Sequence, residues 1–324
     1  MPEVVVSVRD LQTTFHTKVG PVRAVDGISY EIGKGQTLSI VGESGCGKSV
    51  ASYSLMRLIE PPGEITGGQV FLDGEDLLAL PEERMADYRG SRMAMIFQEP
   101  MTALNPVLTV GYQMDEQIMR HMGLPRQASR ERALEMLDRV GIPSPRERYG
   151  NYPHQLSGGM RQRAMIAMAL SCDPTFLIAD EPTTALDVTI QGQILELIQR
   201  MQEELEMSVQ FITHDLGVIS EISDEVLVMY AGMACELAPT QELIGSPRHP
   251  YTVALLESIP RLGRRAQRLP AIGGMVPSLF ELPAGCPFQN RCPRAGEECR
   301  AARPPMETVA PGHKVACFNP VGGR

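Results

Sequence analysis

The sequence predicts an α/β fold built on a mostly parallel, doubly wound sheet, and three observations predict it. Short apolar runs typical of buried strands alternate with segments of helical periodicity. A glycine-rich segment, GESGCGKS (residues 42–49), lies between the apolar run QTLSIVG and the helical pattern VASYSLMRLIE. The 324 residues, 43% of them hydrophobic, suffice for one large domain with a full core and a smaller second unit.

The first forty residues predict strands, which we expect to include an N-terminal antiparallel set. These are VVVSVRDLQTTF, AVDGISYEI and QTLSIVG, with a turn at Gly33 and Gly35 before the last. The helical pattern after Ser49 should continue to the breaker Pro61-Pro62-Gly63. GQVFLDGEDL and RMAMIFQEP predict two more strands, and the second should end at Gln98.

The middle of the chain becomes helical and polar, which predicts a helical subdomain inserted in the core at about residues 99–168. SRERALEMLDRVG is its clearest amphipathic piece. The core then resumes with a helix in SGGMRQRAMIAMALSCDP, a buried strand in TFLIADEP, a helix in VTIQGQILELIQRMQEELE, and strands in VQFITHD and EVLVMYA. Prolines and arginines become frequent after Pro239, so we predict a main domain over 1–240 and a small cysteine-containing extension over 241–324.

Composition excludes several classes of protein. No uninterrupted apolar run reaches eighteen residues, and the first residues lack a basic region before their apolar run, so we expect neither a membrane span nor a secretory signal. The formal charge of −9 opposes a broad nucleic-acid surface. Seven cysteines without an export signal favour free thiols or metal ligands over disulfides.

The glycine-rich segment has the G-x-x-x-x-G-K-S pattern of a phosphate-binding loop and sits in the required strand, loop and helix context. Its glycines allow backbone N–H groups to face the phosphates, with Cys46 as a side-chain filler. Lys48 is expected to reach the β and γ oxygens and Ser49 to hold Mg²⁺. The alternative is a glycine-rich turn that binds nothing. The predicted nucleotide contacts here are Gly42, Ser44, Gly45, Cys46, Gly47, Lys48 and Ser49.

Together with LSGGMRQR (residues 156–163) and FLIADE (residues 176–181), this loop resembles the ATP-binding cassette (ABC) ATPases. The resemblance implies a P-loop NTPase core of RecA-like fold that binds ATP and Mg²⁺. It also implies a head-to-tail dimer, in which the serine and glycines of one subunit close over the γ-phosphate held by the other. In this chain those residues are Ser157, Gly158 and Gly159. Phe15 is the candidate for stacking on adenine. The alternative is that Phe15 is a core residue without contact to the nucleotide.

The same resemblance assigns roles to five polar residues. Asp180 orders the Mg²⁺ shell, Glu181 polarises the attacking water, and His214 contacts the γ-phosphate. Gln98 senses Mg²⁺ and water and joins the core to the helical subdomain, and Asp187 crosses to the partner subunit. Each of these residues also has a structural interpretation that does not depend on the family. The acidic pair would cap a helix, the histidine would be structural, the glutamine would be a solvated turn residue, and Asp187 would cap the next helix.

Further segments resemble the ATP-binding subunits of oligopeptide and dipeptide importers: NYPH before the signature, PMTALNP after Gln98, RHPYT (residues 248–252) and GCPFQNRCP (residues 285–293). In that family the matching cysteines hold a 4Fe-4S cluster; here they are Cys286, Cys292, Cys299 and Cys317. Four thiolates suit Zn²⁺ equally well, and four free thiols are the third possibility. Cys172 and Cys235 are expected to be buried small hydrophobic residues.

The resemblance implies a peripheral ATPase on the cytoplasmic face of the inner membrane. Its expected partners are a second cassette, favoured to be a paralogue, two permease subunits and an extracytoplasmic substrate-binding protein. The cargo stays open among dipeptides, longer peptides, nickel complexes and peptide antibiotics. A soluble cassette protein acting on DNA or ribosomes is the rival class, opposed by the acidic charge and by the ordinary spacing between Ser49 and Leu156. A purely structural or regulatory cassette is a third possibility, opposed by the complete set of catalytic residues.

Overall fold

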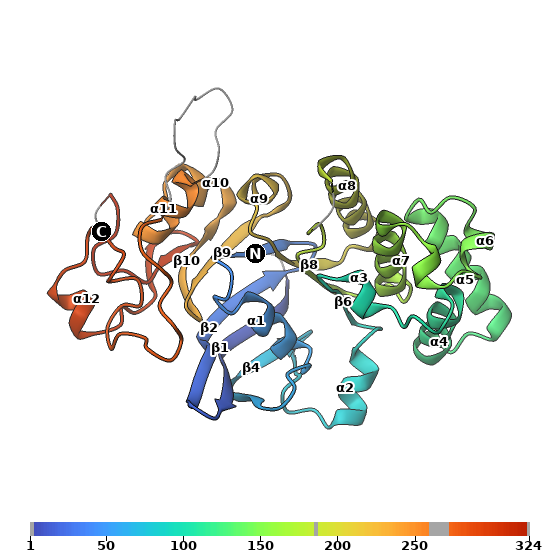
Figure 1. Ribbon diagram of the computed structural model, residues 1–324, viewed down its shortest axis with the longest axis horizontal. Helices are drawn as coiled ribbons and strands as arrows, with labels where there is room; N and C mark the ends of the chain where they lie inside the picture. The colour runs from blue at the N-terminus through green and yellow to red at the C-terminus, as the bar shows by residue number, and fades with distance from the viewer. Residues whose placement is uncertain (1–2, 185–186, 259–271, 323–324) are drawn as a thin grey trace. The chain divides into compact units, whose positions relative to one another are not determined.

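The computed structural model describes residues 3–184, 187–258 and 272–322 (Figure 1). The chain forms two compact units. The first comprises Met1–Val5, Gly33–Gln36 and Ala79–Ile212, and the second comprises Val6–Ile32, Thr37–Leu78 and Thr213–Arg324. Among the described residues, no helix has the length and apolar character needed to cross a membrane.

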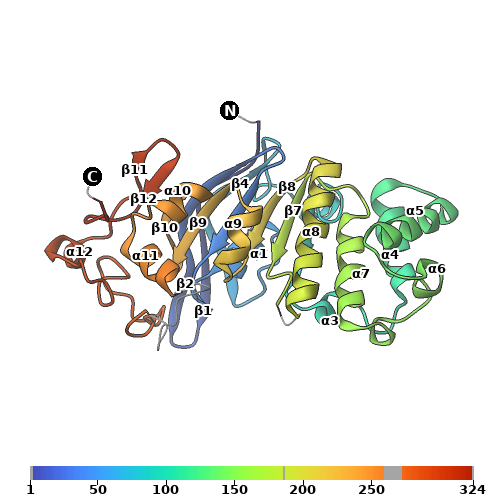
Figure 2. The same ribbon diagram turned by 90° about the horizontal axis from the view of Figure 1, so that it is seen from above.

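The first unit contains a parallel set of strands: β6 (Met93–Ile96), β7 (Phe176–Asp180) and β8 (Ser208–Ile212). All residues of these strands are buried, as expected of parallel strands covered on both faces. The helices around them are α2 (Glu82–Tyr88), α3 (Pro100–Ala103), α4 (Val110–Met122), α5 (Arg126–Arg139), α6 (Pro145–Arg148), α7 (Gly158–Leu170) and α8 (Val188–Leu205), with a 3₁₀ turn at Pro153–Gln155. Figure 2 shows α7 and α8 beside one another.

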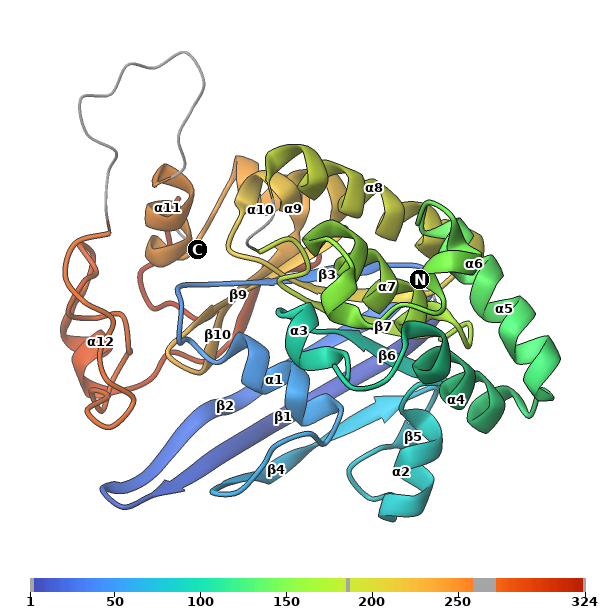
Figure 3. The same ribbon diagram turned by 45° about the vertical axis from the view of Figure 1, so that its right-hand side comes forward.

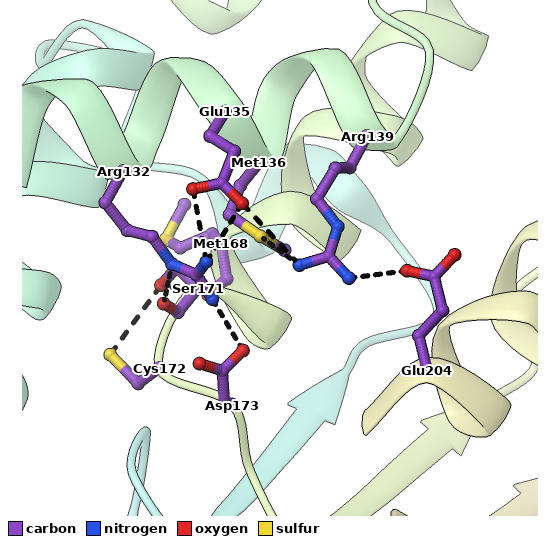
Figure 4. A network of polar contacts seen from close by, with 9 residues as sticks. All are labelled: Arg132, Glu135, Met136, Arg139, Met168, Ser171, Cys172, Asp173 and Glu204. Atoms are coloured by element: carbon purple, nitrogen blue, oxygen red, sulfur yellow. Dashed lines mark hydrogen bonds and ion pairs between the residues drawn. The ribbon is translucent and has the colours of Figure 1, made fainter. Parts of the chain in front are cut away.

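Polar side chains tie the inserted helices to the rest of this unit (Figure 4). Arg132 of α5 pairs with Asp173 at 2.5 Å, and Arg139 pairs with Glu204 of α8 at 2.5 Å. Such exposed pairs contribute at most about 1 kcal/mol each. The fully buried Met136 and Leu137 on the same helix therefore contribute more to its packing.

The second unit contains two groups of strands. One, visible side by side in Figure 3, has the order β2 (Gly20–Gly33), β1 (Val4–Thr17), β4 (Gly63–Leu72) and β5 (Glu75–Asp76), with antiparallel pairing of β1 with β4 and of β4 with β5. In the other, β3 (Thr37–Val41) pairs in parallel with β9 (Glu225–Tyr230), and antiparallel pairing continues through β10 (Met233–Pro239), β12 (His313–Val315) and β11 (Glu307–Ala310). Its helices are α1 (Lys48–Leu55), α9 (Leu216–Ile222), α10 (Thr240–Gly245), α11 (Pro250–Glu257) and α12 (Glu297–Ala301).

These elements confirm the predicted α/β class with antiparallel N-terminal strands, and they correct two predicted ends. The helix after the glycine-rich loop stops at Leu55, before Pro61, because Arg57 adopts a left-handed backbone with φ of 52°. The strand expected to reach Gln98 ends at Ile96. The domain boundary near residue 240 stays a prediction, and the two compact units divide the chain differently.

Candidate active site

The glycine-rich loop, residues 42–49, lies in the second unit between β3 and α1. Two of its glycines are required by close backbone approach. A Cβ on Gly42 would lie 2.2 Å from the Met229 carbonyl oxygen, and a Cβ on Gly47 would lie 2.2 Å from that of Ala24. Both glycines also adopt positive φ angles, so the loop accepts no side chain at either position.

Lys48 begins α1 and folds back over the loop. Its Nζ donates to the carbonyl oxygens of Gly42 at 2.8 Å and Glu43 at 3.2 Å, and the residue is only 6% exposed. Cys46 is fully buried, which agrees with its predicted role as a filler, and this burial raises the pKa of its thiol. Ser44 and Gly45 are exposed and Ser49 is half-buried, so the loop presents its tip and its first helical turn to solvent.

The predicted acidic pair lies in the first unit, at the carboxyl end of β7. Asp180 is the last residue of that strand and is fully buried. Glu181 follows with φ of 46°, a left-handed conformation that costs a residue with a side chain about 1–3 kcal/mol. Its backbone N–H donates to the Ile212 carbonyl oxygen at 2.9 Å, which helps to hold this conformation.

The Glu181 carboxylate receives two hydrogen bonds. Gln98 Nε2 donates to it at 3.3 Å and Thr184 Oγ1 at 2.8 Å, so the structure brings together two of the predicted catalytic residues. Gln98 is exposed and follows β6, the neighbouring parallel strand, which explains the proximity. A carboxylate held in this way can accept a proton from a water molecule.

Two glutamines brace the loop after Glu181, and the sequence did not single them out. Gln162 of α7 donates to the Pro182 carbonyl oxygen at 2.5 Å, and Gln191 of α8 donates to the Thr183 carbonyl oxygen at 3.2 Å. Both sit on predicted helices, but nothing in their spacing indicates a contact with this loop. Thr184 was missed for the same reason.

The predicted signature residues lie at the beginning of α7. Ser157 is the N-cap, and its Oγ accepts from the Met160 N–H at 3.3 Å. Ser157 and Gly158 are exposed and Gly159 is half-buried. Asp187 caps α8 in the same way, accepting from the Ile190 N–H at 2.9 Å, and it too is exposed. Capping satisfies these side chains without preventing contacts to a second molecule.

Two further predicted residues lie in the second unit. His214 is exposed in the segment after β8. Phe15 is half-buried on β1, opposite Gly63 of β4, where a Cβ would approach its ring to 2.7 Å. This position suits either a stacking residue or a packed core residue, so its assignment to adenine stays a prediction.

Cys286, Cys292, Cys299 and Cys317 lie within electrostatic range of one another. The pKa of Cys317 is raised to about 11, chiefly by burial and to a smaller extent by the thiols of Cys292, Cys286 and Cys299. The same electrostatic effect links Cys286 with Cys292 and Cys299. No three His, Cys, Asp or Glu side chains among the described residues are placed as ligands of one metal ion. Both the iron–sulfur and the zinc assignment therefore stay predictions.

Cys235 is buried as predicted, whereas the prediction for Cys172 is only partly met, since that side chain is half-buried. Cys172 lies just after α7, with its thiol near the Gln117 carbonyl oxygen at 3.9 Å.

Comparison with known proteins agrees with these features. Residues 25–184 match the family model of the ABC transporter. The dipeptide transport ATP-binding protein DppD of Bacillus subtilis is 50% identical over 317 residues, covering 98% of this chain and 95% of that protein. The chain belongs to the ABC transporter ATPase family. The oligopeptide transport ATP-binding protein OppD of Salmonella typhimurium is 48% identical, covering 98% of this chain and 94% of that protein.

Two further comparisons extend the family assignment. Residues 235–299 match the model described as the oligopeptide/dipeptide transporter, C-terminal region. Among solved structures, an ATP-binding cassette in a dimeric post-hydrolysis state with ADP and Pi is similar with a TM-score of 0.66 and 26% identity, covering 72% of this chain and 98% of that one. The P-loop NTPase fold of the ABC ATPases is thereby confirmed.

Proposed function

We propose that this chain is an ATP-hydrolysing subunit that drives the import of di- or oligopeptides as part of a multisubunit ABC transporter. The observation that carries hydrolysis is the Glu181 carboxylate, oriented by Gln98 and Thr184 at the end of a buried strand. The match of residues 235–299 to the oligopeptide/dipeptide transporter region, with relatives named for dipeptide and oligopeptide transport, supports the peptide cargo.

In this proposal the loop of residues 42–49 holds the triphosphate through backbone N–H groups and Lys48. Glu181 accepts a proton from the attacking water, and His214 and Gln98 maintain the geometry around it. Ser49, Gln98 and Asp180 are the oxygen donors assigned to Mg²⁺, a cation that prefers such ligands and that neutralises charge on the phosphates when bound. Asp180 suits this assignment because it is the last residue of β7, directly before Glu181.

Residues 157–159 and Asp187 would serve a second cassette, arranged head to tail, which we infer to be a paralogue. ATP binding would close the two cassettes, and hydrolysis would let them open. Two permease subunits would receive this motion through Gln98 and the helices of the first unit, and a substrate-binding protein would deliver the cargo outside. The chain would thus work at the cytoplasmic face of the inner membrane.

Uptake of labelled peptides by cells tests this function. Cells that lack the chromosomal copy and carry the wild-type chain should accumulate labelled di- or tripeptide, and cells carrying Glu181→Gln should not. Competition among a dipeptide, a longer peptide and a nickel chelate identifies the cargo class. Uptake of nickel and not of peptides would mean that the same type of transporter carries a different solute. If none of the three solutes is taken up, the proposal is contradicted.

We also propose a 4Fe-4S cluster at Cys286, Cys292, Cys299 and Cys317. Its support is the spacing of the four cysteines in a segment that resembles the peptide importers, together with the electrostatic effect of three of these thiols on the pKa of the fourth. Bound, it would supply a structural or redox-sensing centre in the C-terminal extension, and these cysteines would hold it there. Anaerobic purification followed by iron, zinc and sulfide analysis decides the assignment. Iron and sulfide in equal amounts support it, whereas zinc without sulfide, or no metal, refutes it.

A further inference from the structure

The C-terminal extension contacts the phosphate loop directly, and the contact converges on one residue. Glu43 is the second residue of the loop GESGCGKS, and its carboxylate accepts two hydrogen bonds from Arg291, at 2.7 Å from Nη1 and 3.0 Å from Nη2. These residues are 248 positions apart in the sequence and lie in the same compact unit. This two-pronged geometry is the strong form of an arginine–carboxylate pair.

The surroundings of Arg291 hold its guanidinium in one position. The side chain is only 4% exposed, and its other contacts are the Tyr230 hydroxyl at 3.2 Å and the carbonyl oxygens of Gly273 at 2.9 Å and Ile272 at 3.3 Å. The guanidinium carbon also lies 5.7 Å from the Tyr230 ring centre and 5.8 Å from that of Phe288, within range of a cation–π contact. A charge buried this deeply is stabilised only while its partner remains in place.

A second contact reaches the same residue through its backbone. The Glu43 N–H donates to the Tyr251 hydroxyl at 2.9 Å, and Tyr251 is fully buried on α11. The Tyr251 ring packs against Tyr230 and Phe288 at 4.7 and 5.3 Å between ring centres. The three aromatic side chains belong to one buried cluster that also contains Cys286 and Cys299.

The Glu43 peptide is therefore fixed from three sides. Arg291 holds its side chain, Tyr251 holds its N–H, and its carbonyl oxygen accepts from Lys48, the lysine expected to contact the phosphates. Two of these three contacts come from outside the motif. A shift of Glu43 would move the carbonyl that orients the Lys48 ammonium group.

We propose that Arg291 is a positioning residue for the phosphate loop, so that the C-terminal extension sets how tightly this chain binds ATP. The inference rests on the proposed role of residues 42–49 as the phosphate site. Arg291 acts through Glu43 and touches no nucleotide itself. Tyr251 supports the same peptide through its hydroxyl, which accepts a hydrogen bond from the Glu43 N–H.

The test measures binding of a fluorescent ATP analogue with Mg²⁺ to the purified full-length chain, together with the melting temperature of the nucleotide-free protein. Arg291→Ala is expected to weaken binding about tenfold, the scale of losing a hydrogen bond to a charged group. Arg294→Ala is the matched control, since among the described residues that side chain donates to the carbonyl oxygens of Asn319 and Pro320 and not to Glu43. It should leave the affinity within about twofold of wild type.

Further variants separate a positioning role of Arg291 from a general loss of folding. Glu43→Ala/Arg291→Ala should bind no more weakly than Arg291→Ala alone, because both changes remove the same contact. Tyr251→Phe removes one hydroxyl and should weaken binding about threefold with little change in melting temperature. If Arg291→Ala proves too unstable to purify, Arg291→Lys, which keeps the charge without the fork, should show an intermediate affinity.

Lys48→Ala distinguishes the two possible failures. If this variant binds the analogue as tightly as wild type, the proposed phosphate site is wrong. If Lys48→Ala loses binding while Arg291→Ala and Tyr251→Phe keep wild-type affinity, the phosphate site stands and the positioning role of Arg291 is refuted. Equal losses in Arg291→Ala and Arg294→Ala would also refute it, because they would indicate a general effect on the fold.

Discussion

The phosphate loop and the signature segment (residues 157–159) are both short glycine- and serine-containing turns before a helix, yet their surroundings differ. In the phosphate loop, Cys46 and Lys48 are buried and Glu43 is held by Arg291 and Tyr251, which are distant in the sequence. In the signature segment, Ser157 and Gly158 are exposed, and the serine side chain caps its own helix. The first is positioned by its own chain, whereas we expect the second to contact a second cassette.

This difference predicts which functions one chain can perform alone. A loop that its own chain positions should bind nucleotide without a partner. An exposed capping serine gains a phosphate contact only if a second molecule brings the phosphate to it. The expected division is therefore binding by the single chain and full turnover by the assembled transporter.

The largest expected effect separates binding from chemistry. Glu181→Gln should leave ATP binding nearly unchanged and reduce turnover by about 10²–10⁴-fold, the contribution of a general base. Phosphate release by the assembled transporter measures it. Glu204→Gln, an exposed glutamate of α8 paired with Arg139, is the control and should keep turnover within about twofold. Turnover of Glu181→Gln close to wild type would assign the hydrolysis to the partner's site.

The next largest expected effect is a dependence of the folding stability on pH, and it arises from a buried histidine. His249 caps α11, accepting from the Tyr251 N–H at 3.0 Å, and burial lowers the His249 pKa from 6.5 to about 4. The unfolded chain therefore binds a proton between pH 6.5 and 4 that the folded chain does not. Stability contributed by neutral His249 is complete above pH 6.5 and falls, by up to about 3 kcal/mol, as the pH drops through this window.

Urea unfolding at pH 7 and pH 4.5 measures this dependence. His249→Asn keeps a side-chain acceptor for the cap and cannot be protonated, so its stability should fall less than that of wild type between the two pH values. Titration of the other groups is common to both proteins and cancels in the difference. Parallel losses in the two proteins would show that His249 does not sense pH.

The smallest effect lies on the exposed side. Ser157→Ala removes the cap of α7 and should reduce stability by about 1 kcal/mol, whereas Ser157→Thr keeps a hydroxyl and should reduce it less. Neither change should alter ATP binding by the isolated chain, but the alanine variant should slow turnover of the assembled transporter. Weaker ATP binding by the isolated chain would place Ser157 at its own nucleotide and remove the contrast.

Much of the fold and of the candidate site could be predicted from the sequence. Strands such as Phe176–Asp180 are continuous apolar runs, and the phosphate loop follows a fixed spacing. The left-handed residue Arg57, which ends α1 early, could not be predicted, since no glycine marks it. The contact of Glu43 with Arg291 escaped for another reason. Each residue alone is an ordinary surface charge, and only the folded chain brings together positions 248 residues apart.

The convergence of the cysteines is intermediate between these cases. Their spacing made a shared centre plausible, and the structure brings their thiols within electrostatic range of one another. Among the described residues, however, no three His, Cys, Asp or Glu side chains are placed to hold a metal ion. Spacing along the chain limits which side chains can meet, but it does not determine the distances at which they do so.

The most direct test of the account is a crosslink between the exposed segment and a second cassette. Ser157→Cys is combined with a cysteine in the partner's phosphate loop, in the assembled transporter, and oxidised with and without ATP; the unsubstituted chain, with its seven native cysteines, is the control. We predict an intermolecular disulfide that forms with ATP when Glu181→Gln blocks hydrolysis and is absent without nucleotide. A crosslink that forms equally with and without ATP, or none under either condition, would contradict the claim that this segment serves the partner's nucleotide.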